Sequence, residues 1–214
     1  MKLERKIILS IETAIEGGSI SIIEGENEID FWQGIKEGLK AEEFLGEISK
    51  VLDKNKIEKK NIKSIIVSNG PGSSTGIKIG LATARGLGTA LSCKVIEVSL
   101  LETILKFVNI GGNSKAFVVV PAGKNLYFLE KVEFVNFKAL KRFERTKAFT
   151  IEKLIEELSL LSNAQVIVKR RSFERYYNLI PDFIIKSNKF VVIEENMASI
   201  IAKNTILNNA SDNK

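Results

Sequence analysis

The segment that most constrains the fold reads SNGPGSSTGIKIGLATARGLGTAL and runs from Ser68 to Leu91. It follows an apolar strand pattern at 64–69 and continues into a helical pattern from about Thr75. The glycines at Gly70 and Gly72 fit neither the P-loop nor the dinucleotide motif G-x-G-x-x-G, because the required later Gly or Gly-Lys is absent. The segment therefore predicts a tight corner between a strand and a closely packed helix.

Small residues recur at every fourth position of this predicted helix, at Gly76, Gly80, Ala84 and Gly88. A second stripe, Ala82, Gly86 and Ala90, lies beside the first. Each interior glycine costs about 0.5–1 kcal/mol relative to alanine, so the helix needs a close neighbour as compensation. That neighbour is either the chain's own sheet or a partner protein, and the spacing alone favours neither.

The first half of the chain alternates between strand and helix patterns. Strands are predicted at 6–12, 19–25 and 28–34, and a helix at 41–54 carries apolar residues at helical spacing. The strand at 64–69, the glycine segment and a strand at 94–98 follow, and then comes a helix with Ser99 as N-cap and Glu102 at the capping-box position. This order predicts an α/β fold with a mixed sheet and helices packed on it.

The second half repeats this order more loosely. The sequence NIGGNS at 109–114 predicts a boundary, which divides the chain into lobes at 1–108 and 109–214. A strand pair with a turn at 122–125, a helix at 150–161 and a strand at 164–169 follow. The last segment, at 190–206, predicts a strand leading into a helix, with Glu194 and Glu195 at the helix start.

Composition excludes several kinds of chemistry. The chain has no histidine and a single cysteine, Cys93, so His/Cys zinc sites and Ser-His-Asp or Cys-His catalysis are excluded. A magnesium site made of carboxylates is still compatible with the sequence. The lone cysteine and the absence of a long apolar segment predict a cytoplasmic protein without membrane attachment.

The net charge of +6 is compatible with weak nucleic-acid contact or with a solvated lysine-rich surface. Basic residues concentrate in two clusters. They are Lys138, Lys141, Arg142, Arg145 and Lys147, and Lys169, Arg170, Arg171 and Arg175. No motif of an RNA-binding module accompanies them.

The glycine segment, continued through SCKVIEVSLLETI, closely resembles the signature region of the TsaB (YeaZ) family, and IILSIETAIEGGSISII resembles that family's opening strand–turn–strand. The resemblance covers roughly residues 6–107. It implies an actin-like ATPase (ASKHA) fold with two related lobes, each with a mixed sheet flanked by helices. It also implies a non-catalytic subunit that binds and activates a TsaD-type transferase in forming threonylcarbamoyladenosine next to the anticodon of tRNA.

Further partners implied by the resemblance are a TsaE-type ATPase and tRNA, the latter bound through the complex. The charge of +6 without a base-reading module predicts that the chain alone binds tRNA weakly. A homodimer is possible when the paralogue is absent, because related surfaces can pair isologously. By analogy the partner surface is built from the helices at 41–54 and 75–91. The implied interface residues are Phe44, Ile48, Gly76, Ile77, Gly80, Leu81, Ala84 and Gly88.

A residual phosphate loop is implied at Glu12, Thr13, Gly70, Gly72 and Ser73. Glu12 stands where the family has aspartate, and Pro121 replaces an aspartate usual in the second lobe. Both departures argue against nucleotide hydrolysis, so no cofactor and no metal are expected. Two alternatives stay open. One is a small-molecule kinase or ATPase that uses Glu12 and Mg²⁺. The other is an RNA-binding protein that works through its basic clusters.

Overall fold

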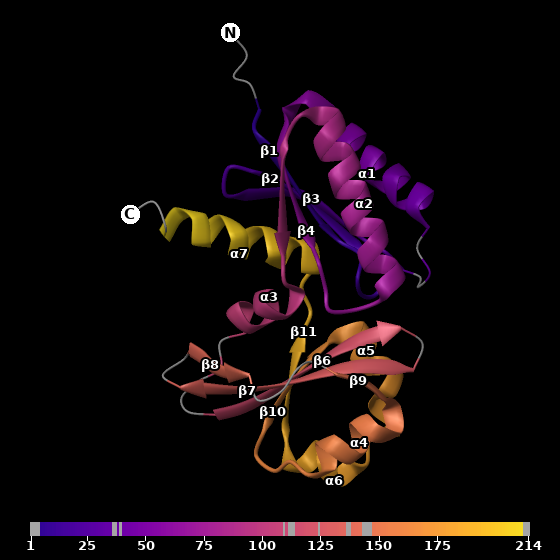
Figure 1. Cartoon of the computed structure of the whole chain (residues 1–214), viewed down its shortest axis with the longest axis vertical. Coiled ribbons are helices and arrows are strands. Elements are labelled where there is room, and N and C mark those ends of the chain that lie inside the picture. Colours follow the sequence, from indigo (N-terminus) through magenta and orange to yellow (C-terminus); the bar gives the residue numbers. More distant parts are fainter. Residues whose placement is uncertain are drawn as a thin grey trace. The chain divides into compact units, whose positions relative to one another are not determined.

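The computed structural model describes residues 5–35, 38, 40–108, 110, 114–123, 125–135, 138–142 and 147–211, with side chains described except at 135–142, 147 and 208–211. The chain forms two compact units. Unit 1 comprises Met1–Phe107 together with Glu195–Lys214, and unit 2 comprises Val108–Glu194 (Figure 1).

Unit 1 is built on a five-stranded sheet with the order β3-β2-β1-β4-β5. Its strands are β1 (Ile7–Glu12), β2 (Ser19–Glu24), β3 (Asn27–Gln33), β4 (Ile62–Ser68) and β5 (Lys94–Val98). The hairpin pairs β1–β2 and β2–β3 are antiparallel, whereas β4 pairs in parallel with β1 and with β5. The mixed sheet predicted from the order of elements is confirmed.

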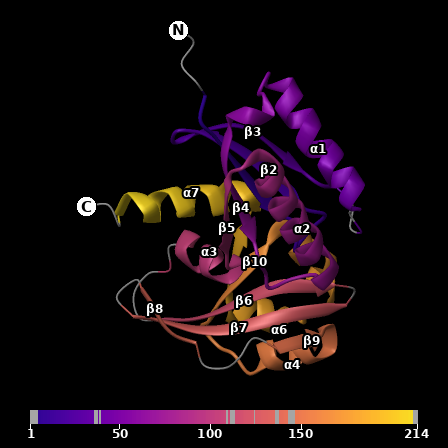
Figure 2. The ribbon, with the colours of Figure 1, turned by 45° about the horizontal axis from the view of Figure 1, so that its top comes forward.

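Helices cover both faces of this sheet. Two of them, α1 (Ala41–Lys54) and α2 (Ser74–Leu91), lie side by side on one face (Figure 1, Figure 2). Alternate residues of β1, namely Ile7, Leu9 and Ile11, are fully buried in the core beneath these helices. The short 3-10 helix η1 (Lys59–Asn61) leads into β4, and α3 (Leu100–Phe107) begins after Ser99, whose Oγ accepts a hydrogen bond from the Glu102 amide at 3.3 Å as predicted.

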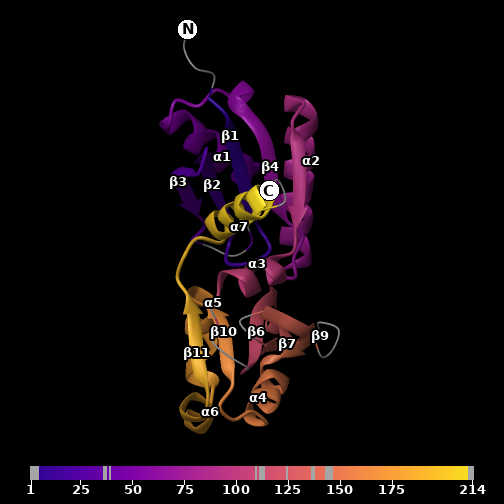
Figure 3. The same ribbon diagram turned by 90° about the vertical axis from the view of Figure 1, so that its left-hand side faces the viewer.

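Unit 2 repeats the topology of unit 1. Its sheet has the order β11-β10-β6-β7-β8, and β9 also pairs with β7. Figure 3 shows β11, β10, β6 and β7 side by side. The strands are β6 (Ser114–Gly123), β7 (Leu126–Val135), β8 (Lys138–Arg142), β9 (Lys147–Thr150), β10 (Gln165–Lys169) and β11 (Lys189–Ile193). Since β6–β7–β8 are antiparallel and β6, β10 and β11 are parallel, the pattern of unit 1 recurs.

The helices of unit 2 are α4 (Ile151–Ser159), α5 (Arg170–Tyr176) and α6 (Asp182–Ser187), with the 3-10 helix η2 (Tyr177–Leu179) between the last two. They enclose an apolar core in which Tyr176 packs edge-on against Tyr127 and Phe173, with ring centroids 5.0 and 5.7 Å apart. The helix predicted at 150–161 is α4, and Thr150 caps it by accepting from the Lys153 amide at 3.4 Å.

The end of the chain corrects the expected lobe at 109–214. The last helix, α7 (Met197–Ser211), packs on β1, β2 and β4 and against α3, so it belongs to unit 1. The Ala198 amide donates to Ser19 Oγ at 3.1 Å, and Asn196 Nδ2 donates to the Trp32 carbonyl at 3.0 Å. The helix approaches closely because the sheet face beneath it carries serines and the helix presents alanines.

The expected acidic start of α7 is also corrected. Asn196 occupies that place, because its Oδ1 accepts from the Ser199 amide at 3.1 Å. Glu194 instead belongs to unit 2, where its carboxylate accepts from Arg170 Nε at 2.7 Å.

Candidate functional site

The glycine corner packs directly against the turn that follows β1. The Ser73 amide donates to the Ala14 carbonyl at 2.8 Å, and Thr13 Oγ1 donates to the Gly76 carbonyl at 2.7 Å. The peptide bond between Gly70 and Pro71 is cis. The structure thus brings the residues of the expected phosphate loop together at one end of the parallel strands, and adds Ala14 and Gly76 to them.

Two glycines of this corner are required by close approach. A Cβ on Gly72 would lie 2.6 Å from the Ala14 carbonyl oxygen, and one on Gly76 would collide with the Thr13 carbonyl. Because both obstacles are backbone atoms, neither can move aside as a flexible side chain would. Corner and turn are therefore in direct contact.

Glu12 ends β1 and its side chain turns back onto the following turn. It is 1% exposed, and its Oε1 accepts from the backbone amides of Ala14 at 2.5 Å and Ile15 at 3.2 Å. Backbone amides at such a turn are the donors that would bind a phosphate. In this chain the Ala14 and Ile15 amides already donate to the Glu12 carboxylate, and the Gly76 amide donates to Ser73 Oγ at 3.3 Å.

Metal binding has no evident place in the described part of the chain. No group of three or more Asp, Glu, Cys or His side chains within it could hold a metal ion. The sole cysteine, Cys93, is half-buried, and burial raises the pKa of its thiol.

The first small-residue stripe faces the chain's own sheet. A Cβ on Gly80 would collide with Thr13 Oγ1, and one on Gly88 would collide with Val95 Cγ2. Ala84 is fully buried in the core. The expectation that Gly76, Gly80, Ala84 and Gly88 lie at a partner surface is therefore not met, since close packing of α2 on the sheet uses them.

The remaining expected interface residues are also largely internal. Phe44 and Ile48 are 0% and 3% exposed, and Phe44 contacts Trp32 with ring centroids 6.1 Å apart. Ile77 and Leu81 are half-buried at the margin of the same core. Of the eight residues, only these two and Gly76 retain partial exposure.

The second small-residue stripe faces outward. Ala82, Gly86 and Ala90 are exposed, and a Cβ on Gly86 would meet nothing within 4 Å. The neighbouring helix α1 also has a mid-helix glycine in open space, Gly46, next to Leu45, which is 44% exposed. We call Leu45, Gly46, Ala82, Gly86 and Ala90 the outer helix face. Sequence spacing had shown the second stripe but could not say which stripe faced the sheet.

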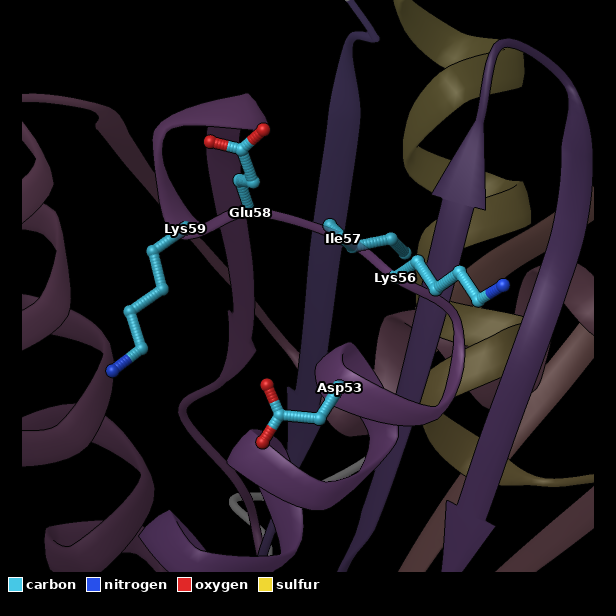
Figure 4. Close-up of a pocket in the computed structure, with 5 residues that line it drawn as sticks. All are labelled: Asp53, Lys56, Ile57, Glu58 and Lys59. Atoms are coloured by element: carbon cyan, nitrogen blue, oxygen red, sulfur yellow. The ribbon is translucent and has the colours of Figure 1, made fainter.

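A hollow of 560 Å³ lies where α1 ends and η1 begins (Figure 4). It is lined by Asp53, Lys56, Ile57, Glu58 and Lys59. The two lysines and two carboxylates point in different directions, so they offer no convergent set of groups for a ligand.

The two basic clusters differ. The side chains of Lys138, Lys141, Arg142, Arg145 and Lys147 lie outside the described residues. In the second cluster, Lys169 is buried and donates to the carbonyls of Ile193 at 3.2 Å and Glu194 at 3.0 Å. Arg170 pairs with the Glu194 carboxylate, so this cluster is largely committed to holding β10 to the end of β11.

The repeated strand order and the corner that joins β4 to α2 define a protein of the actin-like ATPase fold. The chain belongs to the family described as TsaD: tRNA N6-adenosine threonylcarbamoyltransferase, whose model matches residues 40–208. No helix among the described residues is long and apolar enough to cross a membrane.

Individual relatives confirm the resemblance to TsaB and YeaZ. A tRNA threonylcarbamoyladenosine biosynthesis protein TsaB of Buchnera aphidicola from Acyrthosiphon pisum is 25% identical over 211 residues, covering 92% of this chain and 91% of the relative. The TsaB of the Baizongia pistaciae strain is 25% identical over 169 residues, covering 76% and 74%.

Solved structures agree on the fold. YeaZ from Pseudomonas aeruginosa superposes with a TM-score of 0.63 at 13% identity, covering 97% of this chain and 94% of that one. A Bacteroides thetaiotaomicron protein with an actin-like ATPase fold superposes with a TM-score of 0.52 at 11% identity, covering 93% and 96%.

Proposed function

We propose that the chain is a non-catalytic subunit that binds and activates a TsaD-type transferase in the formation of threonylcarbamoyladenosine in tRNA. The observation that carries this proposal is the outer helix face. Gly46 and Gly86 each lie inside a helix, and among the described residues no atom lies within 4 Å of a Cβ added to either glycine. Each costs about 0.5–1 kcal/mol of helix stability, which a closely approaching partner helix would offset.

The partner fits this surface for a physical reason. Two helices approach most closely where both present small side chains, and a paralogue of the same fold presents a related pair of helices. The same argument allows a second copy of this chain to bind isologously when the paralogue is absent. A TsaE-type ATPase and tRNA would then join through the complex.

The glycine corner supports a role without ATP turnover by this chain. A bound phosphate would have to displace the Glu12 carboxylate from the Ala14 and Ile15 amides. It would also need room between the turn and α2, where Thr13 already donates to the Gly76 carbonyl. A kinase or ATPase needs these donors for the transferred phosphoryl group.

The test is a pair of substitutions, one on α2 and one on α3, measured against a TsaD-type partner. Gly86→Leu places a bulky group on the outer helix face while increasing helix propensity, so the isolated chain stays folded. Overpacking typically costs 1–3 kcal/mol, and a loss of about 2.7 kcal/mol weakens association roughly a hundredfold. Lys106→Leu, at an exposed position of α3, is the control. Unchanged partner affinity for Gly86→Leu would reject the outer helix face as the interface.

A further inference from the structure

The edge strand β3 of unit 1 exposes two large apolar side chains. Among the described residues only β2 pairs with it, so β3 forms one edge of the five-stranded sheet. Ile29 is 36% exposed and Phe31 is 55% exposed. At the opposite edge, β5 exposes Lys94 and Glu97 instead, and its apolar residues are half-buried. An edge strand with exposed apolar side chains is a place where a strand of another chain can pair, and charged side chains oppose such pairing.

The pairing of β3 with β2 determines which of its backbone groups point away from the sheet. The Gly34 amide donates to the Gly18 carbonyl at 2.9 Å, at the end of this antiparallel ladder. Hydrogen-bonded and non-hydrogen-bonded pairs alternate along such a ladder. The amide and carbonyl of Trp32 therefore point toward β2, whereas those of Phe31 and Gln33 point outward.

The outward amide of Phe31 already has an acceptor within the chain. It donates to Asp30 Oδ1 at 2.9 Å. The other oxygen of the same carboxylate, Oδ2, accepts from Asn55 Nδ2 at 2.7 Å and lies 2.8 Å from Lys54 Nζ. Lys54 is the last residue of α1, and Asn55 is its C-cap. The end of α1 thus fixes the carboxylate in the position from which it binds the outward amide.

A β-bulge beside Asp30 restricts further pairing at this edge. Two consecutive residues of β2, Ile22 and Ile23, pair with Asp30 and Glu28, so Ile29 between these two is an extra residue in β3. A bulge disrupts the regular spacing of outward groups. Regular pairing with an added strand is therefore limited to the part of β3 after the bulge, where the first outward amide is the one that Asp30 binds.

A second copy of the chain offers an identical strand for pairing. Two β3 strands can pair antiparallel about a two-fold axis, which makes an isologous contact. An axis at Asp30 would place two carboxylates opposite each other, and like charges at opposite positions are destabilising. An axis at Phe31 avoids this repulsion and brings the outward amide and carbonyl of Phe31 from both copies together. That pairing needs the amide that Asp30 occupies.

We propose that Asp30 closes the edge of unit 1 to strand addition by a second copy of the chain. Its carboxylate occupies the donor that pairing requires, so Ile29 and Phe31 can be exposed without making β3 an adhesive edge. This role goes beyond the proposed function and does not depend on it. It also differs from association at the outer helix face, where the contact would be made by helices.

The experiment removes the Asp30 carboxylate and measures self-association of the full chain. Asp30→Ala is the main variant, and Asp30→Thr is a second variant because threonine favours strands and supports folding of β3. Glu24→Ala is the matched control. Glu24 lies on β2, and its carboxylate accepts from Arg5 Nε and Nη2 at 2.9 Å each, so this change removes the same charge and a comparable set of bonds away from the edge. Sedimentation velocity over a range of concentrations gives the association constant, and thermal unfolding checks that each variant is folded.

We expect both Asp30 variants to self-associate at least about tenfold more strongly than the wild type. Glu24→Ala should associate as the wild type does. Adding Phe31→Lys to Asp30→Ala should restore wild-type association, because lysine on an edge strand opposes pairing. Restoration by this change locates the new contact at β3, whether or not the wild type already forms a dimer through its helices.

Three results would overturn the inference. Wild-type association of both folded Asp30 variants would show that the carboxylate does not close the edge. Equal association of Glu24→Ala and Asp30→Ala would attribute the effect to net charge or to lost stability. Association of Asp30→Ala that persists after Phe31→Lys would place the contact on another surface.

Discussion

The carboxylate of Glu12 accepts a hydrogen bond from the backbone amide of Ala14 at 2.5 Å, inside the turn that packs against the start of α2. This contact places an internal anion at turn amides of the kind that can bind a phosphate. The same turn is also held to the start of α2, because Thr13 Oγ1 donates to the Gly76 carbonyl. The first two predictions concern this turn.

Replacing Glu12 by alanine should destabilise the folded chain. The amides of Ala14 and Ile15 would lose their acceptor in a buried site, which costs roughly 1–3 kcal/mol. Glu12→Gln keeps an oxygen acceptor of the same length and should lose less. Chemical denaturation of the three proteins measures the difference. Equal stability of Glu12→Ala and the wild type would show that the carboxylate does not hold the turn.

The isolated chain should not turn over ATP. The turn amides and the Gly76 amide are engaged within the chain, so a transferred phosphoryl group would lack the donors that position it. Phosphate release with Mg²⁺ and ATP is the measurement, and the same assay without protein is the blank. Turnover clearly above that blank would instead support the kinase or ATPase alternative.

Glycine-to-alanine changes on the two sides of α2 should change the free energy of unfolding in opposite directions. Gly76→Ala drives a Cβ into the Thr13 carbonyl and should cost at least about 1–3 kcal/mol. Gly86→Ala enters open space and should stabilise the isolated chain by about 0.5–1 kcal/mol. Thermal unfolding of both variants checks this. If both were destabilised alike, the assignment of inner and outer sides would be wrong.

Asp30 should make the stability of unit 1 depend on pH in the acidic range. Hydrogen bonds from Lys54 and then Asn55 lower the pKa of its carboxyl group. A carboxyl whose pKa is lower in the folded than in the unfolded state stabilises the fold above its unfolded pKa of about 3.9. This contribution is lost as the pH falls through the folded pKa.

The corresponding measurement is the melting temperature of the wild type and Asp30→Asn across the range from neutral to acidic pH. The wild type should be the more stable protein near neutrality, and the gap should narrow on acidification. Lys54 Nζ lies 2.8 Å from Asp30 Oδ2. When Lys54→Met is already present, adding Asp30→Asn should therefore lower the melting temperature less than it does in the wild type. A gap that widens on acidification would contradict the assignment.

Much of the fold could be predicted because local patterns agree with tertiary packing. The helix at 41–54 was predicted with the bounds that α1 has, since its buried residues recur at helical spacing. The helices α5 and α6 were missed because seven and six residues carry too little periodicity. The sequence did not predict that α7 belongs to unit 1, because a helix that follows a strand can pack on either unit.

The candidate site was predicted in its residues but not in its orientation. Spacing places Gly80 and Ala84 on one side of α2 and Gly86 on the other, yet both sides are small and apolar residues flank each. Only the contacts with Thr13 and Val95 identify the inner side. The hydrogen bonds that the Glu12 carboxylate accepts from the Ala14 and Ile15 amides could not be predicted either, because they depend on the conformation of the turn that follows β1.

The position of α7 has a consequence for synthesis on the ribosome. Translation produces β1, β2 and β4 first and then the whole of unit 2 before α7 emerges. One face of the unit 1 sheet is therefore uncovered until α7 has been synthesised. Ser10, Ser19 and Ser21 are buried on that face in the folded protein. Because a serine side chain is small and carries a hydroxyl group, Ser10, Ser19 and Ser21 expose less apolar area on this uncovered face than aliphatic residues would, and exposed apolar area favours association.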